Sequence, residues 1–232
     1  MNYIANDILR IIKLAKNYNA FLIRQVVKII RKNNYKNILD FGCADGYFLE
    51  TMKKNCQEIV PFGVEIDNSS IEFCRQKNLN IYENIKDIPC NLDLIYSFNV
   101  LEHIETDTET MQNFYDILEQ NGKLVLYVPA LTFLFSSMDK KVGHYRRYEK
   151  QKLIDKLTKI GFIIEKIEFC DSLGVLATLL YILKDTLLKN NNGNISKISI
   201  VLYDIIFPLS RLLDILVFKK YCGKNLLVIA KK

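Results

Sequence analysis

The residues that could do chemistry begin with a short turn that contains glycine. Residues 40–46 read Asp-Phe-Gly-Cys-Ala-Asp-Gly and follow a short apolar run. Glycine permits a tight turn there and lets backbone N–H groups approach a ligand closely. Glu65 closes the next apolar run, 25 positions after Asp40, and an acid at the end of a second strand accepts hydrogen bonds from ribose hydroxyls. The turn and the acid together predict a nucleotide-binding site.

A second group contains both histidines of the sequence. His103 follows a buried apolar run, and residues 144–148 read His-Tyr-Arg-Arg-Tyr. Because a neutral imidazole can remove a proton near pH 7, we expect His144 first and His103 second as a general base. Tyr145 and Arg146 complete the predicted catalytic group, since an arginine can hold a phosphate or carboxylate through two hydrogen bonds.

A purely structural interpretation of these residues stays open. Glu102 and His103 can fix a strand-to-helix turn through hydrogen bonds to the backbone. Arg146 and Tyr148 can cap the next helix and pair with surface acids. Cys43 lies inside the turn and is interpreted as a small packing residue, because nothing near it in the sequence favours a reactive thiolate.

These side chains need a scaffold in which strands and helices alternate. Apolar runs between turn residues predict strands at residues 38–41, 59–65, 92–98, 123–128, 162–169 and 225–230. Apolar residues at helical spacing predict helices from about residue 48 and at residues 69–77, 108–118 and 149–160. The alternation predicts an α/β fold with a doubly wound, mostly parallel sheet covered on both faces.

Two segments lie outside this alternation. Residues 1–36 carry a net charge of +7, whereas the whole chain carries +6. Their apolar spacing predicts two helices, broken near residues 17–19, which form a basic cap. Residues 172–220 are strongly apolar and predict a helical hairpin inserted before the last strand. The ligand-binding domain comprises residues 37–171 and 221–232.

Composition excludes several classes of protein. Half of the residues are hydrophobic and 25% are charged, which is typical of a globular chain rather than a disordered one. The small positive charge does not favour a nucleic-acid partner. The six cysteines include no Cys-x-x-Cys pair, so we expect no metal. Charges at Asp7 and Arg10 interrupt any apolar secretory core, so we expect reduced thiols in a cytoplasm. No uninterrupted apolar run reaches the ~18 residues of a membrane-spanning helix.

Residues 38–46, 63–65 and 92–103 together resemble class I S-adenosylmethionine-dependent methyltransferases. The resemblance implies a Rossmann-like sheet of seven strands, S-adenosylmethionine as cofactor and S-adenosylhomocysteine as product. In that family the turn holds the methionine part, the acid binds the ribose, and residues after the third strand frame the adenine. The implied cofactor-binding residues are Asp40, Gly42, Cys43, Ala44, Gly46, Glu65, Ile66, Asn84, Ile85, Phe98 and Asn99.

The sequence departs from the family at two of these positions and leaves two alternatives. Ala44 stands where glycine is usual, and Asn84 where an acid is commoner. One alternative is a nicotinamide-dependent oxidoreductase, although Tyr47 occupies the place of the third glycine that a dinucleotide fingerprint needs. The other is a protein that binds S-adenosylmethionine without transferring its methyl group. Some quinone-pathway O-methyltransferases resemble this chain and bind a divalent ion through Glu-x-x-Glu-His; Asn99 replaces the first Glu, so a metal is not favoured.

The acceptor is the least defined part of the expected function. Similar His-Tyr-Arg-Arg-Tyr segments occur in bacterial methyltransferases that resemble enzymes of cell-surface sugar or lipid pathways. The resemblance therefore implies transfer to an oxygen or nitrogen of a small acceptor that is anionic, or linked to a lipid or sugar.

The apolar hairpin allows three interpretations. Lys197, Asp204 and Arg211 recur every seven residues and predict one narrow polar stripe on an otherwise apolar helix. Such a hairpin can be a lid packed on its own domain, a homodimer surface, or a contact with a membrane surface. We expect it to border the acceptor site, in a cytoplasmic protein that is peripheral to the inner face of the membrane.

Overall fold

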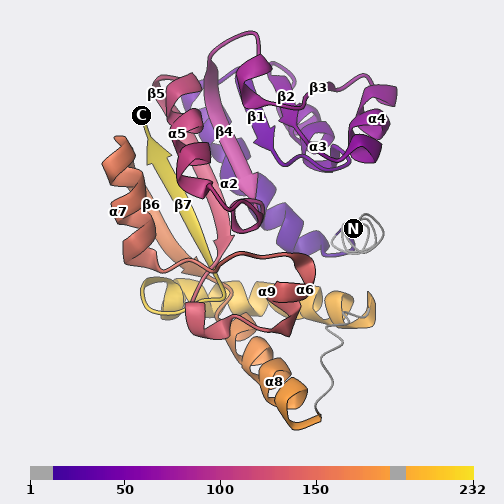
Figure 1. The fold of residues 1–232 in the computed structure, drawn as a ribbon, viewed down its shortest axis with the longest axis vertical. Coiled ribbons are helices and arrows are strands. Elements are labelled where there is room, and N and C mark those ends of the chain that lie inside the picture. Colours follow the sequence, from indigo (N-terminus) through magenta and orange to yellow (C-terminus); the bar gives the residue numbers. More distant parts are fainter. Residues whose placement is uncertain (1–12, 189–196) are drawn as a thin grey trace.

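A seven-stranded sheet forms the centre of the molecule (Figure 1). The computed structural model describes residues 13–188 and 197–232. The strand order is β3-β2-β1-β4-β5-β7-β6, with β7 antiparallel to both of its neighbours and the pairs from β1 to β5 parallel. The strands are β1 (Asn37–Phe41), β2 (Val60–Val64), β3 (Asn80–Tyr82), β4 (Leu92–Phe98), β5 (Leu118–Pro129), β6 (Ile163–Cys170) and β7 (Asn225–Lys231). The predicted Rossmann-like, doubly wound sheet is confirmed.

Helices cover both faces of this sheet. Phe114 and Leu157 are fully buried in the core on one face, and Val26 and Met52 are fully buried on the other. The helices are α2 (Lys16–Asn33), α3 (Tyr47–Asn55), α4 (Asn68–Gln76), α5 (Asp107–Ile117), α6 (Ser137–Val142), α7 (Lys150–Ile160), α8 (Ser172–Leu188) and α9 (Lys197–Leu216). Short 3-10 turns are η1 (Ile85–Asp87), η2 (Leu101–His103), η3 (Thr132–Leu134) and η4 (Phe218–Lys220). In this arrangement α5 and α7 lie on one face, while α2 and α3 lie on the other.

The predicted boundaries differ from the structure mainly where elements are short. β5 begins at Leu118, five residues before the predicted start, because Leu118 pairs with Leu92 across an irregularity in the register. The pattern showed neither β3, which has three residues, nor α6, which has six. Segments of this length contain too few apolar residues for a period to emerge.

The start of α2 corrects the predicted break near residues 17–19. The helix begins at Lys16, so Asn17 and Tyr18 lie in its first turn. Their backbone N–H groups donate to the two carboxylate oxygens of Asp204 on α9, each at 3.0 Å. A distant carboxylate therefore takes the place of a local N-cap, which a local pattern cannot reveal. Most of the first predicted helix falls in residues 1–12, outside the described residues.

The predicted hairpin corresponds to α8 and α9, and its connection at residues 190–194 lies outside the described residues. Phe207 of α9 is buried in the core beside α2, with its ring centroid 5.8 Å from that of Phe21. α9 is therefore part of the folded body and not a detachable flap. Among the helices that the structure describes, none has the length and apolar character needed to cross a membrane.

Candidate functional site

The turn after β1 has the backbone that a close ligand requires. Gly42, Ala44 and Gly46 have φ angles of +81°, +48° and +77°, in the region that side chains disfavour. A Cβ on Gly42 would lie 2.4 Å from Cγ2 of Val100, so only glycine fits there. Gly46 is the N-cap of α3, whose first N–H groups face the turn.

Glu65 lies against this turn, as the sequence predicts. One carboxylate oxygen accepts a hydrogen bond from the backbone N–H of Ala44 at 2.8 Å. The other accepts from the N–H groups of Ile66 and Asp67 at 2.8 and 3.0 Å. Three backbone donors thus hold the carboxylate between the ends of β1 and β2, while the side chain of Ile66 beside it is exposed.

Asp40 supplies a buried carboxyl group, one oxygen of which the described part of the protein leaves without a partner. Its side chain is 3% exposed, and within the described ranges Oδ2 has no hydrogen-bond partner. Burial raises the pKa of this carboxyl well above its ordinary value. An unpartnered buried oxygen at the end of β1 fits a ligand that brings its own donor, directly or through water.

The remaining predicted cofactor residues divide into two groups. Asn99 follows β4, and its side-chain amide donates to the hydroxyl of Tyr18 at 2.9 Å; Phe98 stacks edge-on against Phe48 with centroids 5.4 Å apart. These lie at the same edge of the sheet as the turn. The side chains of three others have partners within the protein: those of Cys43 and Ile85 are buried in apolar clusters, and that of Asn84 accepts from the N–H of Lys86.

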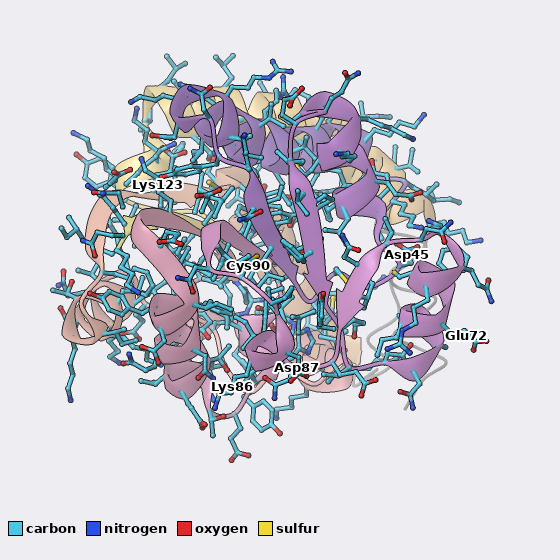
Figure 2. The ribbon with its side chains drawn as sticks, turned by 90° about the horizontal axis from the view of Figure 1, so that it is seen from above. Asp45, Glu72, Lys86, Asp87, Cys90 and Lys123 are labelled. Carbon is cyan, nitrogen blue, oxygen red and sulfur yellow. The ribbon has the colours of Figure 1, made fainter. Side chains whose placement is uncertain are left out.

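A hollow lies apart from the turn, beside residues that Figure 2 labels. Asp45 marks the turn, whereas Lys86, Asp87 and Cys90 lie on the connection from β3 to β4. A hollow of about 380 Å³ between this connection and α5 is lined in part by Lys86 and Cys90. It lies where β4 begins, so it is distinct from the turn at the carboxyl ends of the strands.

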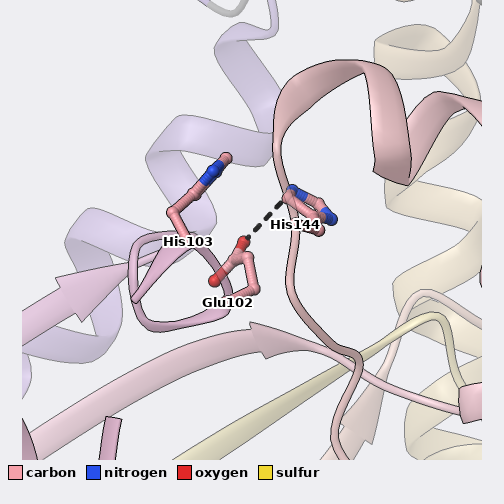
Figure 3. Close-up of side chains that lie close together, drawn as sticks. All are labelled: Glu102, His103 and His144. Atoms are coloured by element: carbon pink, nitrogen blue, oxygen red, sulfur yellow. Dashed lines mark ion pairs between the residues drawn. The ribbon is translucent and has the colours of Figure 1, made fainter. Parts of the chain in front are cut away.

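A cluster of Glu102, His103 and His144 forms the second half of the site (Figure 3). Glu102 is fully buried, and across the described residues neither of its carboxylate oxygens has a hydrogen-bond partner. Burial raises its pKa to about 8. Nε2 of His144 lies 3.8 Å from Oε1 of Glu102, and the two imidazoles meet edge-on with centroids 4.6 Å apart.

Asp139 orients the ring of His144 through the nitrogen that does not face Glu102. Nδ1 of His144 lies 2.8 Å from Oδ1 of Asp139, and the same carboxylate accepts from Nε and Nη2 of Arg147 at 2.9 and 3.0 Å. Burial opposes ionisation of Asp139, but the hydrogen bonds from His144 and Arg147 outweigh it and hold the pKa below its ordinary value. An ionised Asp139 accepts a hydrogen bond from Nδ1–H of His144. The proton of the neutral ring is then on Nδ1, so Nε2 is left as a proton acceptor.

The other residues of the predicted catalytic group have different surroundings. The guanidinium of Arg146 lies 2.8 Å from Oδ1 of Asp107 and donates to the carbonyl of Glu105. Tyr148 donates to Oδ2 of Asp107 at 2.8 Å. Both residues therefore pair with an acid, as the structural interpretation expects, but that acid is buried, and neither side chain caps α7. The side chain of Tyr145 is exposed.

The turn after β1 and the cluster of Glu102, His103 and His144 are neighbours, because the residues at the start of η2 contact both. Val100 contacts Gly42 closely enough to exclude a side chain there, and Glu102 follows two residues later. The side chains of Glu102, His103 and His144 also each place one ligand atom within 4.8 Å of the others, a spacing that one cation can bridge. The arrangement therefore joins a ligand-binding turn to a histidine that can accept a proton.

A family model described as a methyltransferase domain matches residues 14–166. This chain belongs to that family. It is a class I S-adenosylmethionine-dependent methyltransferase, and S-adenosylmethionine is its cofactor. The turn, the carboxylate of Glu65 and the unpartnered oxygen of Asp40 fit this cofactor, whose ammonium and ribose hydroxyls supply donors. Membership sets aside the nicotinamide-dependent alternative.

Solved structures share the fold at low sequence identity. A methyltransferase from Thermotoga maritima, described as a possible histamine N-methyltransferase, is 15% identical with a TM-score of 0.62 and covers 98% of this chain and 95% of its own. One from Archaeoglobus fulgidus is 24% identical, with a TM-score of 0.56 and coverage of 90% and 94%. An O-methyltransferase from a multienzyme of Brevibacillus brevis, in complex with S-adenosylhomocysteine, is 21% identical, with a TM-score of 0.56 and coverage of 90% and 71%. None of the curated proteins matches this chain.

Two residues of the candidate site, Asp139 and Tyr18, were not predicted from the sequence. Asp139 has a local signal, because Ser136 and Asp139 form the capping box that begins α6 and Asp139 precedes His144 by five residues. Tyr18 has none, since it meets Asn99 from 81 positions away in the chain.

Proposed function

We propose that this methyltransferase methylates a hydroxyl oxygen of a small anionic acceptor that is linked to a lipid or sugar. The observation that carries the proposal is the placement of His144 between Asp139 and Glu102. S-adenosylmethionine, when bound, supplies a methyl group on a sulfonium. A hydroxyl becomes a good nucleophile only as it loses its proton, whereas a neutral amine needs no base. A positioned base therefore favours an oxygen acceptor.

His144 is the base in this proposal. Asp139 holds Nδ1 at 2.8 Å, which leaves Nε2 to take the proton as the acceptor oxygen gains the methyl group. The resulting imidazolium is stabilised by the ionised Asp139. His103 is a weaker candidate, because burial and the neighbouring His144 lower its pKa to about 4. We assign His103 to positioning the ring of His144, which it contacts edge-on.

A hollow between α6 and α8 supports the mixed character of the acceptor. Its volume is about 800 Å³, and its lining includes the cationic side chains of Lys140 and Lys141 beside the apolar Phe135 and Ile182. Since Arg146 is already paired with a buried acid, Lys140 is the proposed partner of an anionic group. Phe135 and Ile182 suit the apolar part of the acceptor.

The test is to incubate the protein with methyl-labelled S-adenosylmethionine and extracted lipid-linked and sugar-phosphate fractions. We expect a labelled methyl ether. His144→Gln should lower kcat by about 100-fold or more, with unchanged calorimetric affinity for S-adenosylhomocysteine. His103→Gln is the matched comparison, with a loss of about tenfold or less.

Three results contradict the proposal. A labelled N-methyl amine would show a nitrogen acceptor. A wild-type rate in His144→Gln would remove the base. Tight binding of S-adenosylhomocysteine with no labelled product from any fraction would favour the protein that binds the cofactor without transferring its methyl group.

A further inference from the structure

α9 is oriented with its polar residues inward. Asp204, Ser210 and Asp214 are buried, while Ile205 and Leu209 beside them are more than half exposed. A surface helix of a soluble protein normally shows the opposite arrangement. The apolar face of α9 therefore points away from the core.

Hydrogen bonds of the buried acids fix this orientation. The carboxylate of Asp204 accepts from the first turn of α2. That of Asp214 accepts from the N–H groups of Asp171 and Ser172 at 2.7 and 2.8 Å, at the start of α8. Rotating α9 to bury its aliphatic side chains would leave these backbone donors and the two carboxylates without hydrogen bonds. The free-energy cost of those unpaired polar groups is larger than the cost of exposing the aliphatic side chains to water.

α8 extends the exposed apolar surface. Figure 1 shows α8 projecting away from the sheet and α9 lying across the base of that projection. Several aliphatic side chains on the two helices are each 56–72% exposed, among them Leu180, Leu183, Leu187, Ile198, Ile205 and Leu216. Soluble monomers rarely leave so many neighbouring aliphatic groups in water, and such patches mark contact surfaces.

The charges around this surface indicate what covers it. Among the described residues of α8, α9 and η4, the exposed charged side chains are Lys184, Lys197 and Lys220. The acidic side chains of these helices do not contribute to the exposed surface in the same way. Asp204 and Asp214 are buried, and Asp185 of α8 accepts a hydrogen bond from Ser137 at 2.6 Å. The exposed surface thus combines aliphatic side chains with positive charges from lysine. Such a surface complements an anionic lipid surface. A second copy of this chain brings the same lysines and leaves them unbalanced.

We propose that the outward face of α8 and α9 binds the surface of an anionic lipid bilayer, with the helices lying in the interface. The aliphatic side chains enter the acyl boundary while the lysines meet lipid phosphates. The cytoplasmic leaflet is the natural partner, because anionic lipids concentrate there. This inference does not depend on the identity of the methyl acceptor or of the base.

The test is flotation of the full chain with vesicles of phosphatidylcholine, alone or mixed with phosphatidylglycerol. We expect binding to the mixed vesicles that weakens with salt. The double variant Ile205→Glu, Leu209→Glu should reduce the bound fraction by about tenfold or more. Ile163→Glu is the matched control, since Ile163 is equally exposed at 62% but lies on β6, and it should bind as the wild type does. Replacing Lys184, Lys197 and Lys220 by Gln should remove the preference for the anionic lipid.

Calorimetry with S-adenosylhomocysteine establishes that each variant is folded. Absence of flotation overturns the proposal. If light scattering then shows a dimer that the double variant dissociates, the surface belongs to a second copy; if it shows a monomer, the surface serves neither role. Equal loss of flotation in Ile163→Glu also overturns it, because the effect would not be specific to the hairpin.

Discussion

Glu102 should make the stability of this protein depend on pH in a direction opposite to that of most carboxylates. Burial raises the pKa of Glu102 from an ordinary 4.5 to about 8. Below pH 4.5 both the folded and the unfolded chain keep the proton. Between these values the unfolded chain loses the proton while the folded chain retains it, so the free energy of unfolding falls as pH rises. Above about pH 8 both states are ionised and the fall ends.

The magnitude follows from the same two values. At about 1.36 kcal/mol for each pH unit, a pKa moved from 4.5 to about 8 corresponds to roughly 5 kcal/mol. Relaxation and water entry around the new charge relieve part of this cost, so we expect about 2–4 kcal/mol. Glu102→Gln keeps the shape of the side chain and cannot ionise, so it should lack this component.

The assay is urea unfolding of both proteins at intervals from pH 5 to pH 9, followed by circular dichroism. The measured quantity is the change with pH in the difference between the two free energies of unfolding, because the absolute difference also contains the hydrogen bonding of the new amide. We expect the variant to gain on the wild type as pH rises. Parallel profiles across this range would refute the reasoning that Glu102 is protonated in the folded protein.

Three further outcomes are expected. Glu65→Ala should weaken binding of S-adenosylhomocysteine by about 1–3 kcal/mol in calorimetry, because it leaves ribose hydroxyls unpaired; unchanged affinity would contradict the assigned cofactor site. Gly42→Ala should lower the free energy of unfolding by about 2–4 kcal/mol, since its Cβ would lie 2.4 Å from Val100. Adding Val100→Ala should restore part of it, and an unchanged melting temperature in the single variant would be evidence against this packing. Chelation with EDTA should leave turnover unchanged while added Zn²⁺ inhibits by occupying His144, and loss of turnover on chelation would instead indicate a metal-dependent reaction.

The positions of the candidate cofactor-binding residues could be predicted because these residues stand at the ends of strands. The turn that begins at Gly42 and the acid at Glu65 each follow a short apolar run, and adjacent parallel strands bring such ends together. The contact between Tyr18 and Asn99 has no such signal, since 81 positions separate them. Its prediction would require knowing how α2 crosses the sheet.

For the candidate catalytic group, the sequence predicts the types of residue but not which side chains they bond to. The sequence shows that His144 and Arg146 lie near one another, but not which acids their side chains meet. In the structure Asp139 orients His144, and Asp107 neutralises Arg146. Of these two side chains, His144 is therefore the one that keeps a free ring nitrogen for a substrate, while Arg146 is held by a buried acid.

The hairpin shows why a helical period alone does not determine which face meets water. The stripe formed by Lys197, Asp204 and Arg211 predicts that one side of α9 differs from the others. A stripe of charge ordinarily marks the solvated face, yet Asp204 is buried and bonded to the first turn of α2, and Arg211 pairs with Asp214. The unsatisfied N–H groups at helix starts are stronger local requirements than the burial of any one aliphatic side chain. Those requirements turn Asp204 and Arg211 toward the core, while Lys197 at the start of α9 stays exposed. The aliphatic face of α9 therefore points outward.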